Sequence, residues 1–215
     1  MISDIIILAM EWIGTISFAV SGTLVAISCS LDLFGVITVG CITAVGGGII
    51  RDLLIGNIPP KVFYNPLILL VAASTSILVF LAAYLYRKKF QKFRERAEFF
   101  NIFFDALGLA SFSIAGIEVA CLSSYENNIL LTITLGVITG VGGGILRDVL
   151  VNEKPYILTR HVYAIVSILG CCFYYLISVQ FGHKVIATFF VIIFTVLVRI
   201  LAAKFRWKLP KIQFE

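Results

Sequence analysis

Long apolar runs recur along the whole of this 215-residue chain, and they constrain its fold more than any other feature. A helix that crosses the hydrocarbon core of a bilayer needs about 20 mostly apolar residues. Charged residues are almost confined to the gaps between the runs. We therefore predict an all-α integral membrane protein with seven transmembrane helices. The expected spans are roughly 5–28, 33–55, 66–86, 99–122, 129–151, 161–181 and 185–204.

The composition excludes the main alternatives to a helical membrane protein. Hydrophobic residues make up 60% of the chain and charged residues only 13%, whereas a soluble domain has about 25% charged residues. A transmembrane β-barrel would show alternating polarity in short segments, but these runs are continuously apolar. The sequence contains no motif for a nucleophilic enzyme, a metalloprotease or a nucleotide-binding loop. We expect neither an enzyme, nor a metal site, nor a cofactor.

The basic residues predict the orientation of the chain in the membrane. Lysine and arginine concentrate in loops on the cytoplasmic side of membrane proteins, and two isolated lysines, Lys61 and Lys184, fall on the face opposite the main group. The N-terminus is therefore expected outside and the C-terminus in the cytoplasm. Attraction to the lipid bilayer accounts for the net charge of +5, so nucleic-acid binding is not expected. The cytoplasmic group comprises Arg87, Lys88, Lys89, Lys92, Arg94, Arg96, Lys154, Arg160, Lys204, Arg206, Lys208 and Lys211.

An internal repeat divides the chain. The segment AVGGGIIRDLL at 44–54 is nearly copied as GVGGGILRDVL at 140–150, and SFAVSG at 17–22 resembles SFSIAG at 111–116. Spans one to three therefore repeat as spans four to six, and a seventh span is left over. Because each unit has three spans, the second copy must be inverted in the membrane. We expect a first three-helix repeat over 1–92, a second over 93–182, and a seventh helix with a basic tail over 183–215.

Inverted repeats narrow the class of function. They recur in transport proteins, where the pathway lies near the middle of the bilayer and interrupted helices of both halves meet. A single-pass receptor or a lipid-anchored scaffold has no need of this symmetry. The repeat therefore favours a transport function.

Each copy of the repeated motif contains three consecutive glycines near the middle of a span. Each glycine lowers helix stability by about 1 kcal/mol relative to alanine, so a local bend or unwinding is expected, and it would line a buried or hydrated site. The alternative is close packing, because small residues recur at a spacing of four. The two interpretations are compatible. The glycines are Gly46, Gly47, Gly48, Gly142, Gly143 and Gly144.

An arginine–aspartate pair follows each glycine triplet, as Arg51-Asp52 and Arg147-Asp148. An arginine at membrane depth is unfavourable by a few kcal/mol or more unless it is paired, and such charges often mark functional sites. Adjacent residues on a helix do not face each other. We therefore expect each arginine to pair with a residue elsewhere in the chain.

Three acidic residues lie within the spans and are candidate partners. By depth and symmetry, Glu11 is expected beside Arg51, and Asp105 beside Arg147. These pairs are either polar gates at the two ends of one pathway or buried ion pairs that hold the two repeats together. Glu118 has no acidic counterpart in the first repeat, and it is a candidate cation or proton site or a further partner of Arg51.

The seven-span layout with a doubled GGGxxRD motif resembles the trimeric intracellular cation (TRIC) channel family in its prokaryotic branch. The resemblance implies a homotrimer with a pore in each subunit, lined by spans two and five. The pore would conduct monovalent cations, chiefly potassium, with potassium or sodium ions present only as permeants. It also implies a bacterial plasma (inner) membrane. Related bacterial sequences are grouped as glycine transporters, so a carrier of a small solute such as glycine is the alternative, and a purely structural scaffold is a third class.

Overall fold

The structure is a computed structural model that describes residues 2–86, 94–159, 162–205 and 207. Long helices dominate it, and η2 is a π-helical continuation of α8. Two short elements, η1 (Lys61–Phe63) and α7 (Tyr156–Thr159), lie in the connections. The long helices are α1 (Ile2–Ser28), α2 (Leu33–Leu54), α3 (Pro66–Leu85), α5 (Arg94–Leu122), α6 (Ile129–Leu150), α8 (Val162–Tyr174) with η2 (Tyr175–Gln180), and α9 (Lys184–Lys204).

The predicted fold class is confirmed. Within the described residues, seven helical segments are long and apolar enough to cross a membrane, and they begin and end within a few residues of the predicted spans. The largest difference is at α5, which begins at Arg94, five residues before the apolar run. Part of the basic group used to predict the orientation lies outside the described residues: Arg87, Lys88, Lys89, Lys92, Arg160, Arg206, Lys208 and Lys211.

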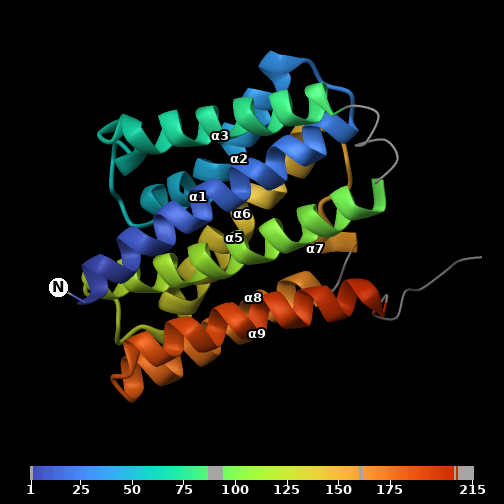
Figure 1. The fold of residues 1–215 in the computed structure, drawn as a ribbon. Coiled ribbons are helices and arrows are strands. Elements are labelled where there is room, and N and C mark those ends of the chain that lie inside the picture. Colours follow the sequence, from blue (N-terminus) through green and yellow to red (C-terminus); the bar gives the residue numbers. More distant parts are fainter. Residues whose placement is uncertain (1, 87–93, 160–161, 206, 208–215) are drawn as a thin grey trace, which may run out of the picture.

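The long helices cross the bundle in alternate directions (Figure 1). Helix α5 lies in the middle, α3 lies at one edge, and α8 and α9 lie together at the other. The apolar core is built mainly around α1 and α5, whereas α3 and α9 expose many large apolar side chains, as helices in contact with lipid do. We call the end at which α1 begins and α2 ends the Arg51 end, and the opposite end, where α6 and α9 end, the Arg147 end.

The repeat extends to the helix termini. The side chain of Asp32 accepts a hydrogen bond from the Gly35 N–H at 2.7 Å before α2, and Asn128 accepts one from the Leu131 N–H at 3.1 Å before α6. Just after the two helices the chain takes a left-handed conformation, at Gly56 with φ +78° and at Asn152 with φ +56°. Glycine and asparagine tolerate this conformation best, so the two copies use equivalent caps at both ends.

The glycine triplets mark the crossing of α2 and α6. A Cβ atom built on Gly47 would overlap the backbone oxygen of Thr139, and one on Gly143 would overlap that of Thr43. Of the predicted bend or unwinding, the unwinding is wrong, because both helices remain α-helical through the triplets, whereas the bend stays a prediction. Close packing of two backbones compensates for the low helix propensity of glycine. Whether α2 and α6 line a pore stays a prediction.

The crossing gives a stability prediction with an adjacent control. We expect Gly47→Ala to destabilise the protein by about 1–3 kcal/mol or more, because the added methyl group overlaps the backbone of α6. Gly48→Ala should be tolerated, since its nearest neighbour would be Arg51 Nη2 at 3.8 Å. The measurement is the thermal unfolding midpoint of the purified variants in detergent. Equal midpoints for the two variants would contradict the close crossing.

Candidate functional site

Each arginine of the repeated motif binds the aspartate that follows it. Arg51 Nε and Nη2 donate to Asp52 Oδ1 at 2.9 and 2.8 Å, and Arg147 Nε donates to Asp148 Oδ1 at 2.8 Å. The expectation that neighbours cannot pair is wrong here. An arginine side chain is long enough to turn back along its own helix, and its planar group presents several donors to one carboxylate.

The same aspartates fasten the end of each helix to the segment that follows it. The second oxygen of Asp52 accepts a hydrogen bond from the Lys61 N–H at 2.9 Å. In the second copy, Asp148 accepts one from the Tyr156 N–H at 2.8 Å. Each aspartate is buried and has both oxygens engaged. The aspartates therefore neutralise the arginines and close the loop after the helix at the same time.

At the Arg147 end, one buried carboxylate joins two arginines. Asp105 Oδ1 pairs with Arg147 Nη1 and Oδ2 pairs with Arg199 Nη2, both at 2.8 Å. Arg147 Nη1 also donates to Ser21 Oγ at 2.6 Å, and Ser21 Oγ donates to Asn101 Oδ1 at 2.7 Å. The structure thus brings Asp105 to Arg147 as expected and adds α1 and α9 to the network.

Aromatic side chains close this end of the bundle. The guanidinium carbon of Arg199 lies 4.3 Å from the ring centre of Tyr163, and Arg147 lies 5.2 Å from that of Tyr156. Tyr163 is buried and packs with Leu109 and Val141. Stacking of a guanidinium on a ring is favourable where both groups are desolvated. Aromatic rings and guanidinium groups therefore pack closely around the Asp105 network.

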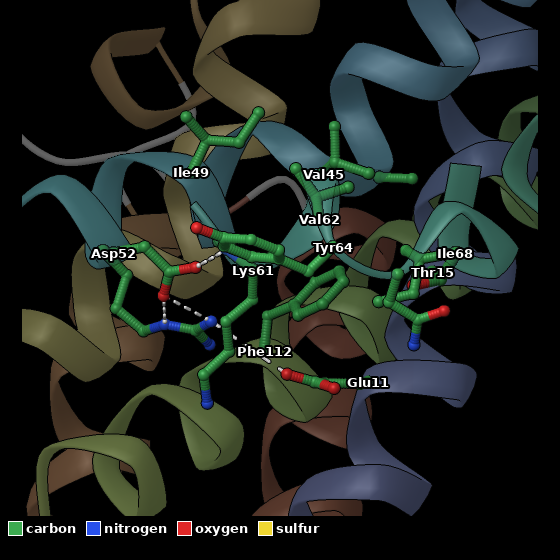
Figure 2. A pocket seen from close by; sticks show the side chains of 14 residues that line it. Glu11, Thr15, Val45, Ile49, Asp52, Lys61, Val62, Tyr64, Ile68 and Phe112 are labelled. Carbon is green, nitrogen blue, oxygen red and sulfur yellow. Dashed lines mark hydrogen bonds and ion pairs between the residues drawn. The ribbon is translucent and has the colours of Figure 1, made fainter. Parts of the chain in front are cut away.

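The Arg51 end is hollow. A cavity of about 280 Å³ lies beside Arg51 and Asp52, and Figure 2 shows Glu11, Lys61 and Asp52 around it. Glu11 Oε1 lies 4.0 Å from Arg51 Nη2, and the Glu11 side chain is 24% exposed, compared with 0% for Asp105. The expected pair is thus brought together loosely. The remaining lining residues are Thr15, Ala44, Val45, Gly48, Ile49, Val62, Tyr64, Asn65, Ile68 and Phe112.

The charges of the cavity suit small hydrated ions or small polar solutes. Glu11 and Asp52 contribute two negative charges, and Arg51 and Lys61 contribute two positive charges. Asp52 is already engaged by Arg51 and by the Lys61 backbone. Glu11 is therefore the carboxylate of this cavity with the most free coordinating capacity. Among the described residues, no cluster of histidine, cysteine and acidic side chains could hold a metal ion.

Glu118 belongs to a separate network, at the Arg51 end of α5. Its Oε1 accepts a hydrogen bond from the Tyr174 hydroxyl and its Oε2 pairs with Lys184 Nζ, both at 2.9 Å. Lys184 Nζ also donates to Ser3 Oγ at 2.6 Å. The alternative that Glu118 approaches Arg51 is wrong, because this lysine at the start of α9 takes its carboxylate. The network joins α5, α8, α9 and the beginning of α1.

Sequence reasoning missed several members of these networks, among them Arg199, Tyr163, Lys184 and Tyr174. Arg199 carried a usable signal, since an arginine deep in an apolar span requires an acidic partner. Asp105 lies at a similar depth on another helix, so the pair could have been proposed from depth alone. The tyrosines carried no such signal, because buried aromatic residues are common in any helix bundle.

The fold and the motif can now be compared with known proteins. A family model described as "Glycine transporter" matches residues 8–84 and again 102–178. A solved structure of a prokaryotic TRIC channel in 0.5 M KCl is 35% identical with a TM-score of 0.82, covering 95% of this chain and 99% of that one. The TRIC orthologue of Rhodobacter sphaeroides is 28% identical with a TM-score of 0.81, covering 94% and 98%. The chain belongs to the TRIC family.

Curated relatives in bacteria support the same family assignment. The inner membrane protein YadS of Escherichia coli is 37% identical over 205 residues, which cover 94% of this chain and 93% of YadS. The membrane protein YvgT of Bacillus subtilis is 36% identical over 94% of this chain and 95% of YvgT. With its seven apolar helices, this TRIC family member is a multi-pass inner membrane protein. Helix α9 and Arg199 lie beyond both segments matched by the family model.

The unequal burial of the two acidic partners predicts unequal effects of the same chemical change. Asp105→Asn should lower the free energy of unfolding by about 3–5 kcal/mol, because it leaves two buried arginines without a full partner. Glu11→Gln should lower it by at most about 1 kcal/mol, because its pair is long and partly exposed. The check is a comparison of thermal unfolding midpoints in detergent. Similar losses for both variants would show that the two ends are equally tightly paired.

Proposed function

We propose that this TRIC family member is a potassium-permeable channel for monovalent cations. Each subunit of a homotrimer would contain its own pore, lined by α2 and α6. The N-terminus would lie outside the cell and the C-terminus in the cytoplasm, so the Arg51 end would face outward. The basic residues of the sequence support this orientation. The solved relatives described as TRIC cation channels support the cation pathway.

The observation that carries the proposal is the charged cavity at the Arg51 end. It reaches from the partly exposed Glu11 to the buried Arg51–Asp52 pair, and its lining includes Gly48 of the α2 glycine triplet. A fixed positive charge in a cation pathway raises the barrier for a cation unless a carboxylate neutralises it, because charges are weakly screened at low dielectric. Asp52 neutralises Arg51, and Glu11 then attracts the cation.

The two arginine–aspartate pairs are suited to act as polar gates at opposite ends of this pathway. Arg147 is neutralised by Asp148 and Asp105, just as Arg51 is neutralised by Asp52. Between the pairs, the glycine-rich faces of α2 and α6 leave backbone in place of side chains along the crossing. Because glycine has no side chain, α2 and α6 would need to separate less to open a path for a cation.

A carrier of a small zwitterion such as glycine is the second candidate. The cavity carries both signs of charge, so Glu11 could hold an ammonium group while Lys61 holds a carboxylate. In carriers built from inverted repeats the two sides open alternately, and a cavity beside one arginine–aspartate pair suits such a cycle. The same residues therefore suit either mode of transport, and kinetics must separate them.

Reconstitution into planar bilayers is the deciding experiment. Discrete unitary potassium currents support the channel. Saturable uptake of labelled glycine into proteoliposomes, without unitary currents, would replace it by the carrier. Native mass measurement in mild detergent should give three times the 23.7 kDa chain, and a monomer alone would contradict the homotrimer.

The charges of the cavity give a matched pair of predictions. Glu11→Gln should lower the unitary potassium conductance and Lys61→Gln should raise it, each by roughly twofold at an ionic strength of about 0.01 M, where screening is weak. Both effects should shrink at about 1 M salt, because the screening length then falls to about 3 Å. Single-channel recording at the two salt concentrations makes the measurement. Changes of the same sign in both variants would exclude an electrostatic role for this cavity in permeation.

A further inference from the structure

An aromatic pair lies where the two repeats face each other. The rings of Phe18 on α1 and Phe112 on α5 have centres 5.2 Å apart and planes inclined at 47°. Both side chains are buried. They are equivalent in the repeat, since they belong to the matched segments SFAVSG and SFSIAG. A contact between equivalent residues of two inverted copies lies on the pseudo-two-fold axis that relates the copies, so the pair marks the centre of the bundle.

Each ring lies in a notch on the opposite helix. A Cβ atom built on Gly108 of α5 would overlap the Phe18 ring, and one built on Gly14 of α1 would lie 2.9 Å from the Phe112 ring. The two glycines are also equivalent in the repeat, because each precedes the phenylalanine of its own copy by four residues. Both copies therefore contain the ring and the notch as one unit, and α1 and α5 hold the two rings between them.

The pair lies midway between the acidic residues of the two repeats. Phe18 follows Glu11 by seven residues, and Phe112 follows Asp105 by seven. Seven residues of α-helix span about 10 Å, and α1 and α5 run in opposite directions (Figure 1). The aromatic pair is therefore about two helical turns from the acidic residue at either end.

Polar side chains approach the pair from both sides. On α1, Thr15, Phe18 and Ser21 follow one another at spacings of three residues, so each is adjacent to the next on the helix surface. Thr15 lines the cavity described above, and so does Phe112 (Figure 2). Ser21 accepts a hydrogen bond from Arg147 on the other side of the pair. The two hydroxyl groups are thus separated by an aromatic ring.

The same rings border the crossing of α2 and α6. A Cβ atom built on Gly143, in the α6 triplet, would lie 3.1 Å from the Phe18 ring. Phe18 and Phe112 also pack in one apolar cluster with Ala44 and Val45, which directly precede the α2 triplet. The aromatic pair therefore lies beside the crossing along which the pathway is proposed.

We propose that Phe18 and Phe112 form the central apolar constriction of the pathway and set its preference among cations. A cation that passes the rings exchanges water molecules for ring carbons, which is unfavourable for a charge. Smaller ions of the same charge give up their water less readily, whereas the ring faces attract a cation that has lost part of its water. The pair therefore favours potassium over lithium. The inference rests on the proposed pathway along the α2–α6 crossing.

Passive ion leak from proteoliposomes tests the constriction. Vesicles loaded with potassium chloride or lithium chloride are diluted into a solution of an impermeant cation, with a protonophore present to balance the charge, and the retained ion is measured by atomic absorption. Phe112→Ala removes one ring. The lithium leak should rise by roughly tenfold, which corresponds to about 1.4 kcal/mol of barrier, and the potassium leak by only about threefold.

Phe173→Ala is the matched control. Phe173 is half-buried and packs against Phe190 and Phe194, with ring centres 5.7 and 5.2 Å apart, in a different apolar cluster between α8 and α9. The same truncation there leaves the central rings in place, so both leaks should stay at the wild-type level. Equal increases in the two variants would show a general loosening of the bundle and would overturn the inference.

Phe18→Leu and Phe112→Leu keep the inference testable if the alanine variant fails to fold. Each leaves an apolar side chain but removes one ring of the pair, so the ratio of potassium leak to lithium leak should fall by about twofold in both. An unchanged ratio in the folded variants would overturn the constriction.

The same assay separates the constriction from the channel proposal. If the wild type leaks potassium and the phenylalanine variants do not differ from it, the channel stands and the constriction fails. If the wild type does not leak but the variants do, the channel proposal fails and the constriction stands. A leak in none of them would overturn both.

Discussion

The sharing of the Asp105 carboxylate between two arginines is the interaction on which the second half of the protein depends. It binds α6 and α9 to α5, and through Ser21 it reaches α1. Asp105, Arg147, Arg199 and Ser21 are all buried, so the charges of the first three are only weakly screened. A carboxylate between two guanidinium groups has a favourable energy only while all partners are present, because each removal leaves an unpaired charge at low dielectric. The network therefore fixes the relative positions of four helices at once.

The crossing of α2 and α6 at their glycine triplets supplies the second constraint. This constraint is steric, whereas the first is electrostatic. Helices α2 and α6 approach until backbone meets backbone at Gly47 and Gly143. Such an approach sets the depth at which the arginine–aspartate pairs lie, since each pair follows its triplet by a fixed number of residues. Polar groups thus reach the interior of the bundle on the two helices whose backbones approach each other closely. The arginines can lie at membrane depth because their own aspartates neutralise them.

The duplicated and the unduplicated parts of the chain have different effects on the structure. The duplicated parts, namely the caps, the triplets and the arginine–aspartate pairs, build two equivalent half-frames of opposite direction. The parts that are not duplicated make the two ends of the bundle differ. Glu11 and Lys61 surround a cavity at the Arg51 end, whereas Arg199 and Tyr163 occupy the Arg147 end.

The sequence by itself determined the seven spans and the inverted repeat, because hydropathy and a repeated motif can be read along the chain without knowledge of its packing. Depth and symmetry were also enough to place Asp105 beside Arg147. Only the tertiary structure decided that each arginine turns back to its own aspartate, that α2 stays helical through its glycines, and that Lys184 takes Glu118. Those outcomes depend on the rotation of each helix about its axis and on side-chain rotamers. Both are set by packing against neighbours that a hydropathy pattern does not identify.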